Sequence, residues 1–594
     1  MKKLFTLLFK SWKWTLLLVA LLMVVSTLCT LSMTLFTRTL IDGYILPLVE
    51  QSVPDFAPLA SALLKLAAVL LVGMIASFAN DVLMIRVEQG TMRHLRVSTF
   101  EHLQSLPLRY FDSRTHGDIM SVFTNDTDTL RQVIGRTIPT VLSASITVVS
   151  TLVSMIVLSF PLTLVSLICT GLSLVATMNM MKRSRVFFKQ RQESLAKVNG
   201  YIEEMVSGQK VVKVFSHERK VLEDFDILNE ELRSNVYNAN RITSIIMPVN
   251  GNIANLGYVL IAVFGAMITI GSGSAALSVG TLVSFLTLHK NFSRPVTQLS
   301  QEMNNIAMAS AGADRVFEVS DETAEVDEGK VTLDKDPDGE WRWKSGERSV
   351  KLEGLVSLKD VDFSYVPEKQ VLYDISLTAY PGQKIAFVGG TGAGKTTITN
   401  LINRFYEIQD GSILYDGFDV KDIAKSSLRQ SLGIVLQETN LFTGTVMDNI
   451  RYGRLDATDK ECRDAAKLVY ADSFIRRLPK GYDTVISGEG GSLSAGERQL
   501  LSIARTAVAN PPVLVLDEAT SSIDTRTEKL IQKGMDSIMK GRTTFVIAHR
   551  LSTVQNADYI IVLDHGHIIE AGKHHELLER KGKYYELFTG GAVN

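Results

Sequence analysis

Apolar and polar positions divide this chain of 594 residues into two contrasting halves. The first half contains long uncharged runs, whereas the second half mixes apolar and charged positions as a soluble globular region does. A helix needs about 20 apolar residues to cross the hydrocarbon core of a bilayer. Six segments predict such spans: Trp14–Phe36, Leu59–Val82, Ile138–Leu158, Leu162–Met181, Ile245–Ile270 and Ala275–Leu288.

The residues at the ends of these segments indicate where the spans end and how they are connected. The last segment is short, and we expect its helix to continue past Lys290. Almost nothing separates the spans around Phe160 and Pro161 or around Gly271 and Gly273, which predicts tight turns between antiparallel helices. The first span follows a basic start, but it is too long for a typical signal peptide and lacks a small-residue cleavage site. We interpret it as an uncleaved first span.

Basic residues indicate which connections face the cytoplasm. They are frequent before the first span, between the second and third, and after the fourth, as at Lys13, Arg96 and Arg185. The connections Ile41–Pro58, Phe160–Pro161 and Gly271–Ser278 contain neither Lys nor Arg. The sequence therefore predicts a multi-pass protein of the cytoplasmic membrane, with both termini on the cytoplasmic side.

The two long basic connections continue the helical pattern of the adjoining spans, so the helices should extend into the cytosol. Phe111–Asp118 and Ser207–His217 contain glycine among polar residues and are the candidates for short crossing elements. Plain cytoplasmic loops are the alternative. In the fifth span, Asn250, Asn252 and Asn255 either bond to another helix or face a cavity that binds a solute.

Net charge and cysteine content exclude some classes of function. A net charge of −1 offers no argument for binding nucleic acid. The three cysteines show neither a disulfide pattern nor metal-ligand spacing. We expect a membrane domain over residues 1–318, an acidic exposed linker with a small hairpin over 319–353, and a second domain over 354–594.

In the second domain, Gly389–Thr396 fits the G-x-x-x-x-G-K-[ST] pattern of phosphate-binding loops and lies between a predicted strand, Lys384–Val388, and a predicted helix. A glycine-rich turn is the alternative. The glycines of a phosphate-binding loop let backbone N–H groups approach phosphate, and the helix N-terminus adds positive potential. In this pattern the lysine binds the β- and γ-phosphates and the threonine hydroxyl binds Mg²⁺. The predicted ATP-binding residues are Gly389, Gly390, Thr391, Gly392, Ala393, Gly394, Lys395, Thr396 and Thr397.

A second apolar strand, Val513–Leu516, ends in Asp517 and Glu518. Ligands of parallel sheets gather at the carboxyl ends of the strands. We therefore expect Asp517 near the metal ion and Glu518 where it can polarise a water molecule. A buried strand followed by solvated acids is the alternative.

Between these motifs lies Leu493-Ser494-Ala495-Gly496-Glu497, which resembles the Leu-Ser-Gly-Gly-Gln signature of ATP-binding-cassette (ABC) transporters. Further family marks occur in order. Tyr365 matches the aromatic residue that stacks on adenine, and Gln437 matches the glutamine that links the γ-phosphate and Mg²⁺ to the membrane domain. Ser521–Asp524 matches the loop that crosses to the other ATP site, and His549 matches the histidine that holds the γ-phosphate.

This resemblance covers nearly the whole chain and implies an α-helical six-span transmembrane domain plus an α/β P-loop ATPase domain with a helical subdomain. Six spans before one cassette resemble the exporter branch. In this family ATP lies between the phosphate loop of one cassette and the signature of another, so the resemblance implies a dimer with a second ABC half-transporter. Closure on ATP would then switch the membrane cavity between two orientations.

The signature departs from the family pattern at Ala495 and Glu497, which add a methyl group and a negative charge. Lys395, Asp517, Glu518 and His549 are intact. This combination resembles the catalytically intact subunit of heterodimeric bacterial multidrug-type exporters. A homodimer that tolerates a variant signature is the alternative.

The cargo stays open. A cavity with scattered Asn, Ser, Thr and Met suits an amphipathic drug, lipid or peptide. A membrane-anchored ATPase with a regulatory or uptake role is the competing interpretation, because fold alone does not decide function.

Overall fold

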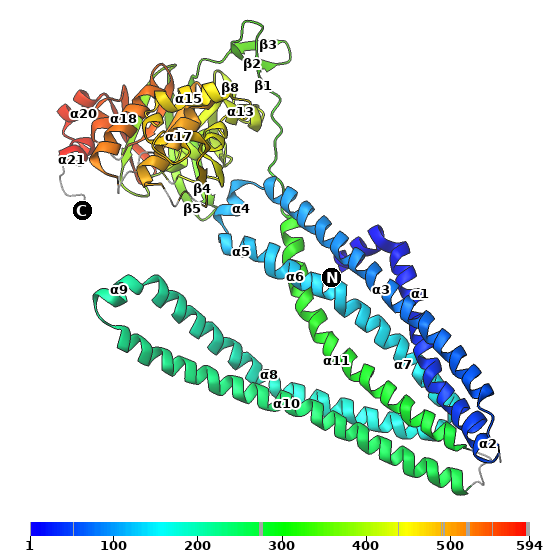
Figure 1. Cartoon of the computed structure of the whole chain (residues 1–594). Coiled ribbons are helices and arrows are strands. Elements are labelled where there is room, and N and C mark those ends of the chain that lie inside the picture. Colours follow the sequence, from blue (N-terminus) through cyan, green and yellow to red (C-terminus); the bar gives the residue numbers. More distant parts are fainter. Residues whose placement is uncertain are drawn as a thin grey trace. The chain divides into compact units, whose positions relative to one another are not determined.

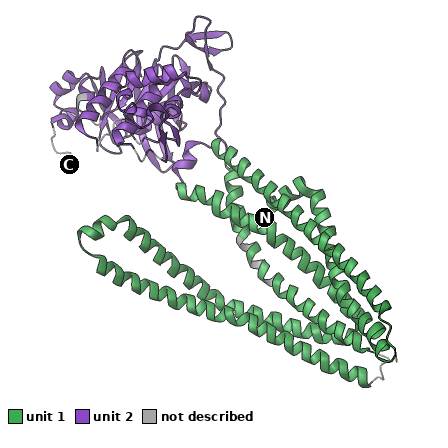
Figure 2. Ribbon diagram, viewed as in Figure 1, with its two compact units in different colours: residues 1–105, 115–323 green, residues 106–114, 324–594 purple. Residues whose placement is uncertain are grey.

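The computed structural model describes residues 2–51, 53–271, 277–437, 439–488, 490, 493–517, 523–548 and 551–589. The chain divides into two compact units, which Figure 2 colours separately. Unit 1 comprises residues 1–105 and 115–323, and unit 2 comprises residues 106–114 and 324–594. Each unit is described here by itself.

Unit 1 is built from helices much longer than a bilayer is thick. The longest, α3, α8 and α10, have 48, 48 and 54 residues, or roughly 70–80 Å at 1.5 Å per residue, against a hydrocarbon core of about 30 Å. Each therefore continues beyond the membrane. The elements of unit 1 are α1 (Lys2–Thr39), η1 (Leu40–Ile45), α2 (Leu46–Val49), α3 (Ala57–Gln104), α5 (His116–Ser121), η2 (Val122–Asp126), α6 (Thr127–Gln132), η3 (Val133–Thr137), α7 (Ile138–Leu158), α8 (Phe160–Ser207), α9 (Gln209–Val214), α10 (Glu218–Gly271) and α11 (Val279–Asp321).

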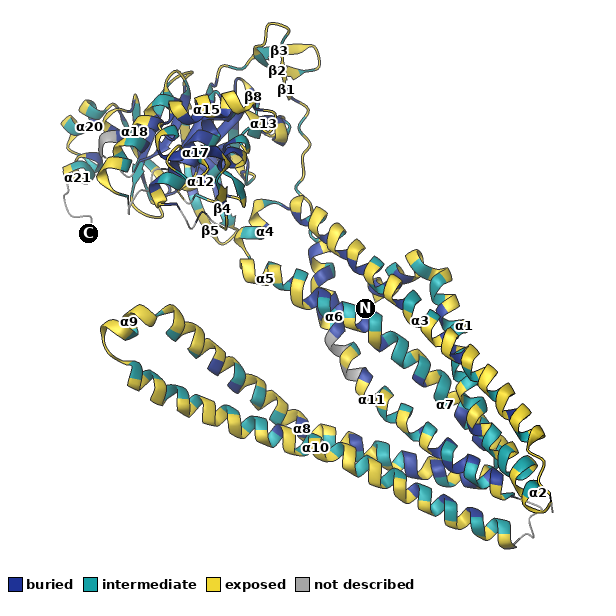
Figure 3. Ribbon diagram, viewed as in Figure 1, coloured by how far each residue is buried: buried dark blue, intermediate teal, exposed yellow. Residues whose placement is uncertain are grey.

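Within the described residues, five helical segments are long and apolar enough to cross a membrane. Figure 3 shows many exposed positions along these helices. Exposed apolar side chains, such as Trp14, Leu64 and Phe78, suit contact with lipid. The expected sixth span begins at residues 275–276, which lie outside the described residues. Its continuation, α11, runs past Lys290 as expected and packs against α1, α7 and α10.

The helices of unit 1 pack chiefly in pairs, α1 with α3, α7 with α11, and α8 with α10 (Figure 1). The predicted tight turn is one extended residue, Ser159, between α7 and α8. Between α8 and α10, the Asn250 side chain accepts hydrogen bonds from Ser173 (2.9 Å) and Thr177 (3.1 Å). Asn250 therefore makes the helix–helix contact that was one of the two alternatives.

The two candidate crossing elements differ in how well they match the structure. The short helix α9 (Gln209–Val214) lies within the expected Ser207–His217. The expected Phe111–Asp118 is instead the end of one short helix, α4 (Leu108–Asp112), and the start of another, α5. The break arises because Thr115 caps α5, accepting a hydrogen bond from the N–H of Asp118 at 3.1 Å.

Unit 2 is organised around a six-stranded sheet with the order β15-β14-β6-β13-β12-β9, parallel except for β15. An antiparallel sheet, β5-β4-β7-β8, packs beside it. The elements of unit 2 are α4, β1 (Thr332–Lys335), β2 (Trp341–Ser345), β3 (Arg348–Lys351), β4 (Val356–Val366), β5 (Lys369–Ala379), β6 (Lys384–Gly389), α12 (Lys395–Ile402), β7 (Asp410–Tyr415), β8 (Phe418–Asp419), α13 (Lys425–Ser431), β9 (Leu432–Val435), β10 (Gly444–Thr445), α14 (Val446–Arg451), α15 (Asp459–Leu468), α16 (Asp472–Ile475), η4 (Gly481–Asp483), β11 (Val485–Ile486), α17 (Ala495–Ala509), β12 (Val513–Asp517), α18 (Thr525–Met539), β13 (Thr543–Ile547), α19 (Leu551–Gln555), β14 (Tyr559–Asp564), β15 (His567–Gly572), α20 (His574–Arg580) and α21 (Lys583–Thr589).

The main sheet is covered on both faces, which explains its continuous apolar strands. Along β12, Val513 and Val515 join the core shared with the antiparallel sheet, whereas Leu514 and Leu516 join the core shared with α14, α15, α17 and α18. Successive side chains of a strand point to opposite faces. Two separate cores therefore hold one sheet, and its carboxyl edge is left for the loops.

Most of the segment expected as an exposed linker, from residue 324 onward, is part of unit 2. It forms a three-stranded sheet, β1-β2-β3, instead of a small hairpin. Trp343 is fully buried, and its Nε1–H donates to Asp416 at 2.9 Å. Burial of an aromatic side chain with a satisfied N–H is strongly stabilising. The acidic composition of the segment did not reveal this core position.

Candidate nucleotide-binding site

The last residue of β6 and the loop that follows it include four glycines, which are under different constraints. A Cβ on Gly389 would lie 2.2 Å from a backbone oxygen of β14, and one on Gly394 would lie 2.5 Å from a leucine side chain of β5. Gly394 also has φ +101°, which favours glycine. A Cβ on Gly390 or Gly392 would meet nothing within 4 Å. Packing therefore requires the outer glycines, whereas the middle ones line open space where the backbone can approach a ligand.

Lys395, the first residue of α12, is held over this loop. Its side chain is buried, and its Nζ donates to the backbone oxygens of Gly389 at 2.9 Å and Gly390 at 2.8 Å. Burial lowers the pKa of Lys395, and the negative charge of Asp517 opposes this shift. The loop thus presents one positive charge beside its open glycines.

The next two residues of α12 point to different surroundings. Thr396 is exposed, so its hydroxyl can reach a ligand or a metal ion. Thr397 is buried, and its Oγ1 accepts a hydrogen bond from the hydroxyl of Tyr365 at 3.2 Å. Tyr365, on β4, is half-buried and packs edge-on against Tyr406, with ring centroids 4.9 Å apart. The predicted adenine-stacking residue therefore lies beside the phosphate loop.

The carboxyl edge of the main sheet brings two other predicted residues, Asp517 and Gln437, to the same side as the loop. Asp517 ends β12 opposite Ile547 of β13. Gln437 is exposed two residues after β9, which pairs with β12. Glu518 and His549, which follow β12 and β13, lie outside the described residues.

The oxygen atoms at this edge fit Mg²⁺, which favours carboxylate, hydroxyl and amide oxygen together with phosphates of a bound nucleotide. Thr396, Asp517 and Gln437 supply these three donor types. In the part of the chain that the structure describes, no group of three or more His, Cys, Asp and Glu residues could hold a metal ion by itself. A site that uses one carboxylate together with nucleotide oxygens agrees with both observations.

The signature segment begins helix α17 through a reciprocal capping box. Ser494 Oγ accepts from the N–H of Glu497 at 3.3 Å, and Glu497 Oε2 accepts from both the N–H and the hydroxyl of Ser494 at 2.9 Å. A capping box of this kind satisfies two helix N–H groups at once. The carboxylate of Glu497 therefore serves the helix end, a role that the sequence comparison with Gln did not suggest.

The two remaining signature positions have distinct roles. Ala495 is exposed in the first turn of α17. A Cβ on Gly496 would lie 2.3 Å from the Thr527 methyl group on α18. Close packing between these two helices therefore requires glycine at position 496.

Comparison with known families agrees with this arrangement. Residues 16–296 match the ABC transporter transmembrane region, and residues 372–521 match the ABC transporter family. An ABC transporter ATP-binding protein of Bacillus subtilis is 40% identical over 576 residues, which cover 97% of this chain and 92% of that protein. The chain belongs to the ABC transporters.

Two further relatives place this ABC transporter among proteins with fused membrane and ATP-binding domains. A fatty acid ABC transporter ATP-binding/permease protein of Mycobacterium bovis is 40% identical over 533 residues, covering 90% of this chain and 82% of that protein. The structure of a bacterial Atm1-family ABC exporter with ATP bound superposes with a TM-score of 0.76 at 26% identity, covering 98% and 99% of the two chains. The chain thus has the exporter architecture, a helical membrane domain fused to an ATPase coupled to transport. Half-transporters of this kind dimerise.

One pair near the ABC transporter's nucleotide site was not predicted. The hydroxyl of Tyr406 donates to the carboxylate of Asp112 on α4, and both burial and this hydrogen bond raise the pKa of Tyr406. Because Tyr406 also contacts Tyr365, a short chain of contacts joins α4 to α12. Nearly three hundred residues separate the partners, so no local pattern could have indicated it.

Proposed function

We propose that this chain is one subunit of a dimeric exporter of the bacterial cytoplasmic membrane that moves an amphipathic or hydrophobic solute by alternating access. A drug, a lipid or a peptide would be its cargo. One observation carries the proposal: Lys395 is held over an open phosphate loop and beside Asp517, in a chain whose other unit is a bundle of membrane-length helices. An ATP-driven motor and a membrane path thus share one polypeptide.

Each residue around the loop has a separate role in ATP binding or hydrolysis. Lys395 and the N–H groups of residues 389–394 bind the phosphates, and Tyr365 stacks on adenine. Thr396, Gln437 and Asp517 would hold Mg²⁺, which would neutralise charge on the phosphates. Glu518 orients the attacking water, and His549 holds the γ-phosphate. In this proposal the positive charges, Lys395 and Mg²⁺, face the phosphate oxygens where negative charge develops during transfer.

Coupling to the membrane helices uses α4 as one connection. Tyr365 binds the nucleotide base in this proposal, and its ring contacts Tyr406, which in turn bonds to Asp112 of α4. A shift of Tyr365 on nucleotide binding therefore reaches α4 through two direct contacts. Gln437 supplies the second connection, from the γ-phosphate side.

The partner is a second ABC half-transporter, and we favour a different chain over a second copy. In the dimer, Ser494 and the backbone of Gly496 face the ATP bound to the partner. The hydroxyl of Ser494 already donates to the Glu497 carboxylate, and a charged acceptor holds such a proton more strongly than a neutral one. The departures at Ala495 and Glu497 therefore weaken the partner's site, while this chain supplies the intact hydrolytic residues.

Inside-out vesicles that contain the chain and its partner provide the test. ATP should drive accumulation of a fluorescent amphipathic drug or lipid, and the accumulation should stop without ATP. Glu518→Gln is the matched control, because it keeps the size of the side chain and removes the carboxylate. We expect it to retain ATP binding and to lose at least about a hundredfold in hydrolysis, in the range of general acid–base contributions.

Two results would count against this proposal. Full turnover by Glu518→Gln would reassign the role of that residue. Brisk ATP hydrolysis without accumulation across a broad panel of drugs, lipids and peptides would favour the regulatory or uptake alternative.

A further inference from the structure

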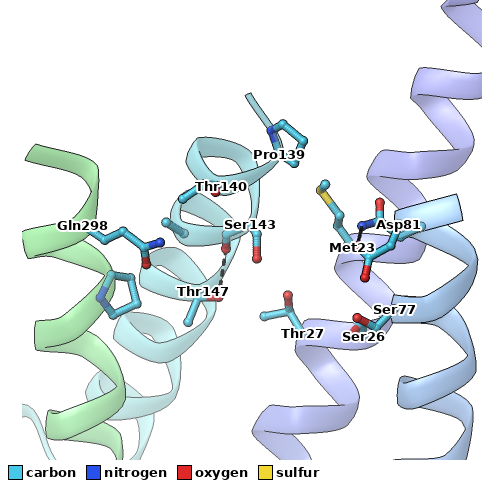
Figure 4. Close-up of a pocket in the computed structure, with 13 residues that line it drawn as sticks. Met23, Ser26, Thr27, Ser77, Asp81, Pro139, Thr140, Ser143, Thr147 and Gln298 are labelled. Atoms are coloured by element: carbon cyan, nitrogen blue, oxygen red, sulfur yellow. Dashed lines mark hydrogen bonds between the residues drawn. The ribbon is translucent and has the colours of Figure 1, made fainter. Parts of the chain in front are cut away.

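A polar cavity of about 310 Å³ lies within the helix bundle of unit 1. Four helices line it, α1, α3, α7 and α11 (Figure 4). Hydroxyl groups face it from both sides: Ser26 and Thr27 of α1, Ser77 of α3, and Thr140 and Ser143 of α7. Its size reaches the lower end of the range for small-molecule sites.

The cavity also contains a carboxylate, Asp81 of α3. Two close contacts between α1 and α3 show how far Asp81 lies along the membrane-spanning part of the bundle. Cys29 of α1 contacts Gly73 of α3, and Trp12 of α1 contacts Gly90 of α3. The two contact positions are 17 residues apart on α1 and also 17 residues apart on α3. The two antiparallel helices therefore keep the same pairing of residues between these contacts. Asp81 therefore lies opposite Leu21, inside the uncharged segment of α1 and roughly 12 Å beyond Lys13.

The polar groups at this depth are acceptors that need a donor. Asp81 Oδ1 accepts from the Asn80 amide at 3.2 Å, and no Lys or Arg lines the cavity or forms a recorded ion pair with Asp81 among the described residues. The Oδ1 atom of Asn80 is buried without a hydrogen-bond partner in the same part of the chain. A carboxylate within a membrane-spanning segment is costly and usually marks a functional site.

An apolar cavity of about 280 Å³ adjoins the polar one. Both cavities are lined by Met23 and Pro139, and the apolar one continues along Leu16, Ala20 and Leu142. A solute with a polar end and an apolar body would fill both cavities.

We propose that Asp81 and Asn80 bind a primary ammonium group of an amphipathic solute, whose apolar part occupies the adjoining cavity. This inference rests on the proposed function, since the bound solute is the exporter's cargo. It also narrows that function, because a free carboxylate such as that of a fatty acid would meet the negative charge of Asp81. The relative from Mycobacterium bovis, which its name assigns to fatty acids, would therefore differ from this chain in cargo.

A matched pair of probes tests the proposal on the purified full-length chain in lipid nanodiscs without ATP. Dansylcadaverine carries a primary ammonium at the end of its chain, and dansyl-aminohexanoate carries a carboxylate there. The change in dansyl fluorescence, measured to saturation, gives each affinity. We expect the ammonium probe to bind at least about tenfold more tightly, a difference of about 1.4 kcal/mol.

Three variants distinguish an effect of the Asp81 charge on probe affinity from a general effect of substitution. Asp81→Asn should weaken binding of the ammonium probe about tenfold and strengthen binding of the carboxylate probe, because the repulsion between two carboxylates is removed, whereas Asp81→Glu should keep the preference for the ammonium probe. Asp226→Asn makes the same chemical change at an exposed position of α10 and should change neither affinity. Equal affinity of the ammonium probe for the wild type and Asp81→Asn would overturn the proposal, and so would tighter binding of the carboxylate probe.

The binding assay and the transport assay distinguish failure of the ammonium site from failure of the proposed exporter function. Saturable ammonium binding that depends on Asp81, without ATP-driven accumulation in vesicles, would leave the site and remove the exporter role. Accumulation of neutral or anionic cargo, with no effect of Asp81→Asn on either probe, would leave the exporter role and remove this site.

Discussion

At the scale of single residues, the signature segment has two roles that oppose one another. Ala495 raises helix propensity by about 1 kcal/mol relative to glycine, and Glu497 completes a capping box at the N-terminus of α17, where negative charge is also favourable. In the proposed dimer the same methyl group and charge lie near the phosphates of another chain. The local stability of α17 and the affinity of the composite ATP site are therefore in conflict at these positions.

Restoring the usual signature should reverse this balance. The double variant Ala495→Gly with Glu497→Gln should raise the ATPase rate of the purified chain severalfold at saturating Mg-ATP. The reason is that the hydroxyl of Ser494 would no longer donate to a charged acceptor. The same variant should lower the free energy of unfolding by about 1 kcal/mol, the usual cost of a weakened helix start.

A control for this experiment exists on α15. Glu461 forms the same capping box with Thr458, far in sequence from any predicted site residue. Glu461→Gln should reduce thermal stability and leave the ATPase rate unchanged. If the restored signature hydrolyses ATP no faster than the wild type, the departures do not limit catalysis.

At the scale of elements, an ion-pair cluster holds the first residues of the 324–594 part of unit 2 against α13. Glu325 accepts from Lys425 Nζ at 3.1 Å and from both Nη atoms of Arg429, at 3.0 and 2.6 Å. Burial alone would raise the pKa of Glu325, but the hydrogen bonds from Arg429 and Lys425 outweigh burial and lower it. The cluster holds the chain where it enters the β1-β2-β3 sheet.

Stability should therefore depend on pH through Glu325. A carboxyl group with a lowered folded pKa stabilises the fold above its unfolded pKa of about 4.3, and this contribution is lost as pH falls through the folded value. Glu325→Gln should cost about 2 kcal/mol at pH 7. Thermal unfolding of the wild type and the variant should differ at pH 7 and converge in acid.

Glu340→Gln provides the comparison for this experiment. Glu340 pairs with Lys351 at 2.6 Å, but both side chains are half exposed, and surface pairs contribute little. No measurable change is expected for this variant. A loss for Glu325→Gln that persists unchanged at low pH would show that packing, not charge, is responsible.

At the scale of the whole molecule, the chain carries one phosphate loop and one signature, so it contains the two halves of an ATP site only once. In the proposed arrangement these halves belong to different sites, and a partner chain is needed to complete each. Because the weakened signature would serve the site of a second copy, a homodimer should be a poor ATPase.

Purification of this chain alone should therefore give slow ATP turnover. Addition of its natural partner half-transporter should raise the rate at least about tenfold, and Glu518→Gln in this chain should remove the increase. Vanadate-sensitive turnover by the chain alone, as fast as that of the mixture, would establish the homodimer.

Local patterns were sufficient for five membrane-length helical segments among the described residues and for the strand, loop and helix that contain the glycines of residues 389–394. A run of about 20 apolar residues and the loop from Gly389 to Thr396 each depend on neighbours in sequence, because bilayer thickness and phosphate geometry act on short segments. The same holds for the strand that ends in Asp517. Family resemblance added the pairing of the loop with Ser494 and the adenine-binding role of Tyr365, which remain predictions for this chain.

Long-range packing decided the rest. The burial of Trp343 against Asp416, the contact of Tyr406 with Asp112, and the convergence of Asp81 with hydroxyls of α1 and α7 join residues that are distant in sequence. No periodicity encodes such meetings, because they arise only when whole elements pack. Even the signature residue Glu497 was judged from sequence by its charge alone, and the geometry of the helix start determined which partner that charge has.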